Sequence, residues 1–312
     1  MHCKICKKGK LEKKFNYDEQ ISYLICPNCK ILTRFPDNLT IDYYNDYMDD
    51  DKLSKSKSLA KYYFKLFEST VNKNAKILEI GGSFGFFSLL MKIKKNCIVR
   101  NIELSKHCAD FANKNGVPTF STIADLDINS FDYIFSFHVI EHIEPNLLMN
   151  FIQESLNLLK PCGKLIMLTP NAVSSKINLL KEHYTWLAPD EHICFQSPYS
   201  VQYLINSTNF DYISYSQKPA FVHYPINSLI SKFRSKITKR KFPSNKQNST
   251  DKQSISLKQR IISILKKGFH TAIFLERLYL YPFYWLYDLF HKEYDELVII
   301  INKKKSPRNS RG

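Results

Sequence analysis

The sequence lacks an uncharged apolar stretch long enough to cross a membrane. The best candidate, AIFLERLYLYPFYWLYDLF, is interrupted by Glu276, Arg277 and Asp288, and its longest uncharged run, Leu278 to Tyr287, has ten residues. A membrane-spanning helix needs roughly 20. The first ten residues are basic and contain cysteine, instead of the apolar run typical of a signal peptide. We therefore expect no transmembrane helix and a cytoplasmic, reducing location.

Acidic residues are scarce in the last third of the chain. Residues 218–312 hold 20 Lys and Arg against 6 Asp and Glu, within a formal net charge of +16 for the whole chain. Residues 232–260 are basic and polar without apolar periodicity, and Phe269 to Phe290 is rich in aromatic residues. A polybasic loop beside an aromatic-rich amphipathic stretch favours peripheral contact with an anionic inner membrane face. Closure of these aromatics over the domain, or a dimer contact, explains them equally well.

Half of the eight cysteines form two pairs near the N-terminus. These are CKIC (Cys3, Cys6) and CPNC (Cys26, Cys29), with 19 residues between the pairs. Two such knuckles supply four thiolates that can close tetrahedrally on one Zn²⁺, as in a structural zinc ribbon. The alternative is two separate dithiols that are redox-active or have no chemical role. We expect a ribbon over residues 1–36 whose folding depends on the metal.

From residue 71 the chain alternates short apolar runs with helical patterns, which predicts an α/β sheet with helices on both faces. The expected strands cover residues 75–80, 97–104, 117–123, 131–137, 163–170, 210–216 and 295–305. The expected helices cover residues 85–95, 106–116, 146–160 and 198–209, with one more opening near Glu141. We divide the chain into the ribbon, a helical linker or lid over 37–70 that includes Tyr43, Tyr44 and Tyr47, a core over 71–217 and 295–305, an insertion over 218–294 and a disordered tail over 306–312.

A glycine-rich turn, GGSFGFF, follows the first strand of the core. A dinucleotide-binding loop needs glycine at three spaced positions, but Ser83 and Phe86 occupy two of them. A phosphate-binding loop ends in Gly-Lys-Ser/Thr, and the turn has no lysine. Glu79 precedes the turn, and Glu103 ends the second strand, where a carboxylate can accept both hydroxyls of a ribose. This pattern favours a ligand with a ribose but no pyrophosphate.

Five motifs resemble those of one enzyme family in order and spacing: LEIGGSFGFF, NIELS, FDYIFSFHVIEHI, LKPCGKLIMLTPN and PDEHICFQS. The chain is similar to class I S-adenosylmethionine-dependent methyltransferases, in particular to the bacterial types 11, 12 and 23 with an N-terminal zinc ribbon. The resemblance runs from CKIC to about Tyr215 and resumes at DELVIII. It implies a Rossmann-like seven-stranded methyltransferase sheet and S-adenosyl-L-methionine as cofactor. Ser83 replaces the usual middle glycine, and PCG replaces Pro-Gly-Gly.

The resemblance also implies roles for individual residues. The methionine part of the cofactor would be held by Glu79, Gly81, Ser83 and Gly85. The ribose hydroxyls would bind Glu103, the adenine would lie on Leu104, and Phe137 and His138 would border the transferred methyl group. The acidic residue that many relatives place near the adenine has only stand-ins here, namely Ser121, Thr122 or Asp125. A helix-capping role for Glu79 and a structural role for Glu103 stay open.

A hydroxyl acceptor needs a base, and histidine is the usual one near neutral pH. The candidates are His138, His142, His183 and His192, of which His142 is better explained as a cap or packed imidazole. Glu191-His192 resembles the acid-histidine pair of related sugar methyltransferases, although neighbours on an extended segment point to opposite sides. Tyr184 and Trp186 would line the acceptor pocket or pack in the core.

The acceptor itself is implied only by the resemblance. A sugar in surface-polysaccharide or secondary metabolism, either nucleotide-linked or lipid-linked, is the favoured acceptor. A quinone-type or other small molecule is the alternative. A zinc-ribbon nucleic-acid-binding protein is the alternative of another class. It is disfavoured because the basic residues are interleaved with Ser, Asn and Gln, and not with the aromatics that stack on bases.

Overall fold

The computed structural model describes residues 1–37, 50–206, 212–218 and 294–303. The chain forms two compact units, one of residues 1–173, 189–218 and 296–312, the other of residues 174–188 and 219–295. Almost all of the expected insertion, the expected tail, and Tyr43, Tyr44 and Tyr47 lie outside the described residues. Among the helices that are described, none is long and apolar enough to cross a membrane.

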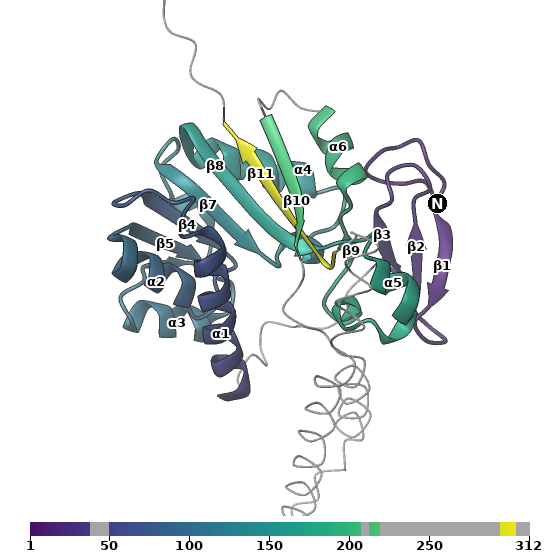
Figure 1. Ribbon diagram of the computed structural model, residues 1–312, viewed down its shortest axis with the longest axis horizontal. Coiled ribbons are helices and arrows are strands. Elements are labelled where there is room, and N and C mark those ends of the chain that lie inside the picture. The colour runs from purple at the N-terminus through teal and green to yellow at the C-terminus, as the bar shows by residue number, and fades with distance from the viewer. Residues whose placement is uncertain (38–49, 207–211, 219–293, 304–312) are drawn as a thin grey trace, which may run out of the picture. The chain divides into compact units, whose positions relative to one another are not determined.

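The larger sheet of the first unit has seven strands in the order β10-β11-β8-β7-β4-β5-β6 (Figure 1). The strands are β4 (Lys76–Ile80), β5 (Ile98–Ile102), β6 (Thr119–Phe120), β7 (Phe131–Phe137), β8 (Leu159–Pro170), β10 (Tyr212–Lys218) and β11 (Glu296–Asn302). Strands β4 to β8 pair in parallel, and β11 is antiparallel to both β8 and β10. The predicted seven-stranded α/β sheet is confirmed.

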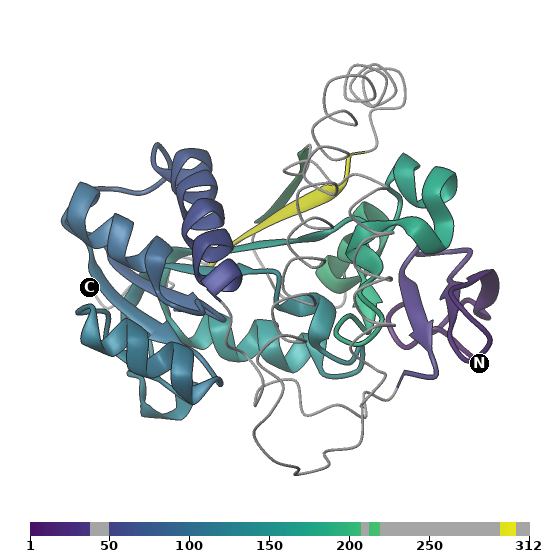
Figure 2. The ribbon, with the colours of Figure 1, turned by 90° about the horizontal axis from the view of Figure 1, so that it is seen from below.

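Helices cover both faces of this sheet (Figure 2). They are α1 (Asp50–Phe67), α2 (Phe86–Lys95), α3 (Lys106–Lys114), α4 (Leu148–Leu158) and α6 (Pro198–Asn206). Ile77 and Phe135 pack with α1 and α2 on one face, whereas Leu78 and Ile134 pack with α4 and α6 on the other. Because neighbouring strand residues point to opposite faces and both faces are buried, the strands are apolar throughout. Continuous apolar runs were therefore the right sequence signal.

Two predicted helices differ from the observed ones. The helix expected near Glu141 is a single 3-10 turn, Ile140–His142. Pro145 follows, and a proline disfavours helical backbone at the residue that precedes it. The helix expected over 146–160 is α4, and β8 already begins at Leu159, so that the PCG sequence belongs to the strand. Residues 138–142 consequently stay at the carboxyl edge of the sheet.

The N-terminal strands form a second, antiparallel sheet with a fourth strand from far along the chain. Its order is β1 (Glu12–Asn16), β2 (Ser22–Ile25), β3 (Leu32–Phe35) and β9 (Cys194–Phe195). Leu32 pairs with Phe195 and Thr33 with Cys194. A two-residue strand carries no periodicity, so β9 was not predictable from the pattern. The ribbon is thus tied directly to the segment that follows His192.

Candidate functional site

The four N-terminal cysteines converge on one point. Their sulfur atoms all lie within 4.8 Å of one another, Cys3 to Cys29 and Cys6 to Cys26 at 3.5 Å, and all four residues are buried. Four sulfurs at about 2.3 Å from a tetrahedral Zn²⁺ would stand about 3.8 Å apart. The cluster therefore has the size and the ligand chemistry of a four-thiolate zinc site.

The two cysteine knuckles are built alike. In each, the residue after the second cysteine donates its N–H to the carbonyl of the first: Lys7 to Cys3 at 3.1 Å and Lys30 to Cys26 at 2.9 Å. Both lysines have a φ of 56°. Gly9 permits the close approach of the knuckles, since a Cβ there would lie 2.6 Å from the Cys26 sulfur. Two equivalent turns that aim four thiols at one centre fit a metal better than they fit separate dithiols.

The glycine turn between β4 and α2 has left-handed backbone at three positions. Gly81, Ser83 and Gly85 have φ values of 74°, 50° and 72°. The Gly81 N–H donates to the Ile102 carbonyl at 2.8 Å, and a Cβ on Gly81 would lie 2.4 Å from the Val139 side chain. Left-handed backbone favours glycine. This geometry explains why glycine is usual at the position of Ser83, and it means that the serine there is strained.

Glu79 supports this turn from inside the protein. It is 4% exposed, and its Oε2 accepts hydrogen bonds from the Ser88 N–H at 3.1 Å and the Ser88 hydroxyl at 2.6 Å. Burial raises the pKa of Glu79 to about 7, against the effect of both hydrogen bonds. These contacts favour the capping role for Glu79, in which the carboxylate fixes the first turn of α2. Its contact with the cofactor stays a prediction.

Glu103 connects the glycine turn to α3. Its Oε2 accepts from the Ser83 N–H and its Oε1 from the Ser105 N–H, both at 2.8 Å. Burial raises the pKa of Glu103, while these backbone donors act in the opposite direction. A carboxylate has about four lone-pair sites, so each oxygen can still accept one ribose hydroxyl. Leu104 beside it is 58% exposed, which leaves an apolar surface where the adenine is expected.

His138 occupies the carboxyl end of β7 with a φ of 54°. Its Nδ1 lies 3.0 Å from Glu141 Oε1, and its Nε2 lies 3.5 Å from Glu296 Oε1. Burial alone would lower the pKa of His138, but the two carboxylates raise it to about 9. A raised pKa favours the protonated ring and makes His138 a poor base, and its catalytic role stays a prediction. Phe137, the last residue of β7, lies next to His138 in the chain and packs on the ring of Tyr63 at a centroid distance of 4.4 Å.

Glu296 is a site residue that the sequence pattern did not reveal. It is 2% exposed, it begins β11 opposite Pro170, and its Oε2 accepts from the Tyr62 hydroxyl at 3.0 Å. Its position beside His138 depends on the antiparallel register of β11, which no motif encodes.

His192 lies close to Glu141 and His142. One ligand atom of each of these three lies within 4.8 Å of the others. Glu191 takes part through its backbone, because its carbonyl oxygen lies 2.7 Å from His142 Nδ1. His192 thus lies in a cluster of two histidines and a buried glutamate, and the acid-histidine pair with Glu191 stays a prediction.

The predicted pocket aromatics, Tyr184 and Trp186, belong to the second unit. Tyr184 is 2% exposed, and its hydroxyl donates to Asp295 at 3.0 Å. Lys176 forms a buried ion pair with the same carboxylate at 2.7 Å. These contacts support the core-packing interpretation of Tyr184. The side chain of His183, also in this unit, is 45% exposed.

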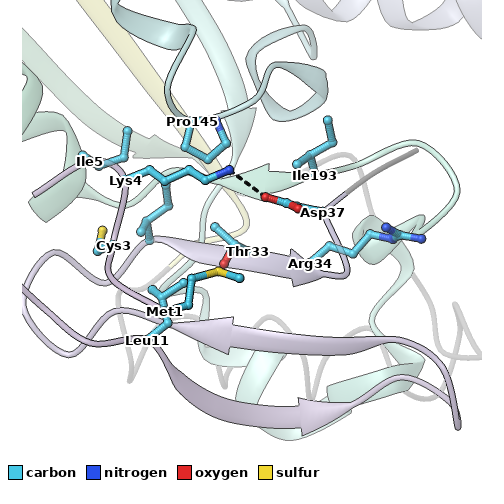
Figure 3. Close-up of a pocket in the computed structure, with 11 residues that line it drawn as sticks. Met1, Cys3, Lys4, Ile5, Leu11, Thr33, Arg34, Asp37, Pro145 and Ile193 are labelled. Carbon is cyan, nitrogen blue, oxygen red and sulfur yellow. Dashed lines mark hydrogen bonds and ion pairs between the residues drawn. The ribbon is translucent and has the colours of Figure 1, made fainter. Parts of the chain in front are cut away.

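A mostly apolar pocket opens at the junction of the ribbon with residues Pro145 and Ile193 (Figure 3). Lys4 and Asp37 form an ion pair of 2.8 Å within it. This pair raises the pKa of Lys4 and lowers the pKa of Asp37. The lining of the pocket includes neither the glycine turn nor Glu103, so this pocket is not the expected cofactor site.

Comparison with known proteins identifies a family for this chain. The sequence matches the family described as "Methyltransferase domain" over residues 54–215. Among solved structures, the chain is similar to an S-adenosylmethionine-dependent methyltransferase of Archaeoglobus fulgidus, with 14% identity, a TM-score of 0.48, and coverage of 79% of this chain and 94% of the other. A second such enzyme, from Thermotoga maritima, has 16% identity, a TM-score of 0.47, and coverage of 81% and 95%.

A third structure is phosphoethanolamine N-methyltransferase 2 of Haemonchus contortus in complex with S-adenosyl-L-methionine. It has 15% identity, a TM-score of 0.45, and coverage of 75% of this chain and 50% of the other. No curated protein matches the sequence. The match over residues 54–215 identifies the family.

Proposed function

The chain belongs to the methyltransferase-domain family and is an S-adenosylmethionine-dependent methyltransferase, and from this premise we propose that its acceptor is a sugar, either nucleotide-linked or lipid-linked. The observation that supports cofactor binding most directly is Glu103, whose carboxylate holds the glycine turn by Ser83 and still has acceptor capacity for a ribose. The sugar rests on the resemblance of PDEHICFQS to sugar methyltransferases, which is a weaker basis for substrate.

S-adenosylmethionine, when bound, supplies a methyl group already activated by its sulfonium. The chain then has to hold the acceptor in line with that methyl and help its proton leave. An acceptor oxygen would form the new bond to the methyl carbon as the carbon–sulfur bond breaks. Phe137 and His138 would border this point. Because the carboxylates of Glu141 and Glu296 raise its pKa, His138 would stay paired with them and would not take the proton of the acceptor.

A methyl-transfer screen tests the acceptor. The intact protein would be incubated with methyl-labelled S-adenosylmethionine and, separately, with nucleotide sugars, lipid-linked sugars, quinone precursors or RNA. We expect label in one of the two sugar classes. Label only in a quinone precursor or in RNA would contradict the sugar acceptor without affecting the assignment as a methyltransferase.

We also propose that Cys3, Cys6, Cys26 and Cys29 bind one zinc ion that has a structural role. The matching knuckles and the sulfur distances support this. Elemental analysis should find zinc, and replacement of Cys29 by serine should lower both the zinc content and the unfolding temperature. A protein that folds without metal and with free thiols would contradict the proposal.

The proposal of peripheral membrane contact depends on residues 219–293, which are outside the described residues. Flotation with liposomes tests it. Binding should require anionic lipid and should weaken as salt is added. Equal recovery with neutral and anionic liposomes would contradict it.

A further inference from the structure

Glu141, His142 and His192 bring together three side chains of types that can bind a metal ion, and methyl transfer from S-adenosylmethionine does not require one. One ligand atom of each lies within 4.8 Å of the other two. We propose that these three residues bind one divalent transition-metal ion, separate from the zinc of the ribbon. Two imidazoles and one carboxylate are a set that holds zinc or ferrous ions while leaving coordination positions open.

His142 is held in the tautomer that a metal ligand needs. Its Nδ1 lies 2.7 Å from the Glu191 carbonyl oxygen, which can only accept a hydrogen bond. Nδ1 therefore carries the proton, and in the neutral ring Nε2 carries the lone pair. Histidines that bind metals almost always donate their other ring N–H to a carbonyl or carboxylate in this way. The contact also gives Glu191 a role that does not involve its side chain.

Glu141 is oriented by hydrogen bonds on both of its oxygens. Oε2 accepts from the Thr169 hydroxyl and Oε1 lies beside His138 Nδ1, both at 3.0 Å, and the residue is fully buried. Each oxygen has a further lone pair for a cation. Carboxylate ligands of metals are usually hydrogen-bonded by such neighbours, which fix their orientation.

His192 is brought to this pair by backbone contacts. The N–H of the next residue, Ile193, donates to the Glu141 carbonyl at 2.8 Å, and the His192 ring lies edge-on to the His142 ring at a centroid distance of 4.8 Å. Ligands bonded to one ion at about 2.0–2.1 Å stand roughly 3–4 Å apart. Closure around an ion therefore requires the ligand atoms to move on the order of 1 Å toward one another.

The catalytic consequence rests on the proposed function. His142 is partly exposed, whereas Glu141 and His192 are buried, so an acceptor would have to reach an ion held here from the side of His142. An acceptor hydroxyl bound to the ion would have a lowered pKa and would release its proton to water before its oxygen attacks the methyl carbon. In this arrangement His192 is a metal ligand and not the base.

The test counts metal ions on the full-length protein, dialysed against Zn²⁺ and, separately, against Co²⁺. We expect two ions per chain in the wild type, and one in His142→Gln and in His192→Gln. The matched control, His107→Gln, changes an exposed histidine of α3 and should keep two. Cobalt on four thiolates gives an intense near-ultraviolet band, whereas cobalt on nitrogen and oxygen does not. Retention of that band shows that a variant is still folded around its ribbon.

A wild-type chain that binds one cobalt ion, with the thiolate band and no second spectrum, would overturn the proposal even if both variants failed to fold. Two ions in folded His142→Gln or His192→Gln would overturn it as well. The count is independent of the methyltransferase assignment. One ion with tight S-adenosylmethionine binding contradicts only the second site, and two ions without such binding contradict only the cofactor assignment.

Discussion

The hydroxyl of Ser197 donates a hydrogen bond of 2.6 Å to the carbonyl oxygen of Cys29. It joins the cysteine cluster to the chain just after β9, and both residues are fully buried. Since β9 pairs with β3 and directly follows Ile193, the ribbon and the segment around His192 are parts of one packed structure. The ribbon therefore positions a candidate site residue more than 160 positions away in the sequence.

Replacement of Ser197 by alanine should weaken this connection. The Cys29 carbonyl and the Ser200 N–H would both lose their bond to the hydroxyl. A buried polar group left without a partner costs about 1–3 kcal/mol, so the free energy of unfolding should fall by about that amount. Urea titration measures it. Ser58→Ala, at an exposed position of α1, is the control and should change stability by less than about 0.5 kcal/mol. Equal effects of the two changes would count against the connection.

Replacement of Glu103 by glutamine should weaken cofactor binding. The amide has half the acceptor capacity of the carboxylate and no charge, and a hydrogen bond to a charged group contributes about 1.5–3 kcal/mol. We expect the Kd for S-adenosylmethionine to rise about 10-fold to 100-fold. The control is Glu154→Gln, an exposed residue of α4. Unchanged affinity in a folded Glu103→Gln protein would remove Glu103 from the cofactor site.

Two residues with left-handed backbone lie at positions where class I methyltransferases usually have glycine. They are Ser83, with a φ of 50°, and Cys162, with a φ of 65°. Relief of strain of about 1–2 kcal/mol exceeds the entropy cost of glycine, about 0.5–1 kcal/mol. Ser83→Gly and Cys162→Gly should therefore each stabilise the protein, by up to about 1 kcal/mol. Ser58→Gly, inside α1, should destabilise it by a similar amount. Destabilisation by all three would contradict the strain.

The buried carboxyl group of Glu79 should make the free energy of unfolding depend on pH. Its pKa is raised by burial from 4.5 to about 7. A group whose pKa is higher in the folded state stabilises fully below its unfolded pKa and loses that contribution as pH rises through the folded value. Between pH 5 and 8.5 the wild type should thus lose free energy of unfolding relative to Glu79→Gln, which keeps an acceptor for Ser88. A difference that does not vary with pH would show that Glu79 is not buried in this way.

The sequence predicted those features that are local. The continuous apolar strands, the paired cysteines and the turn between Glu79 and Glu103 each depend on spacing within a short segment. The features that the sequence did not predict depend on strand register and on backbone contacts. Glu296 reaches His138 only because β11 is antiparallel to β8, and Glu191 contributes a carbonyl, which any residue has. The fold and the glycine turn could be predicted from the sequence pattern, whereas the surroundings of His138 and His192 could not.

Calorimetric titration of the zinc-loaded, intact protein with S-adenosylmethionine tests the central claim most directly. We expect one saturable site per chain, with binding that the product S-adenosylhomocysteine competes for. A folded, zinc-containing protein that shows no saturable binding of either compound would contradict the account.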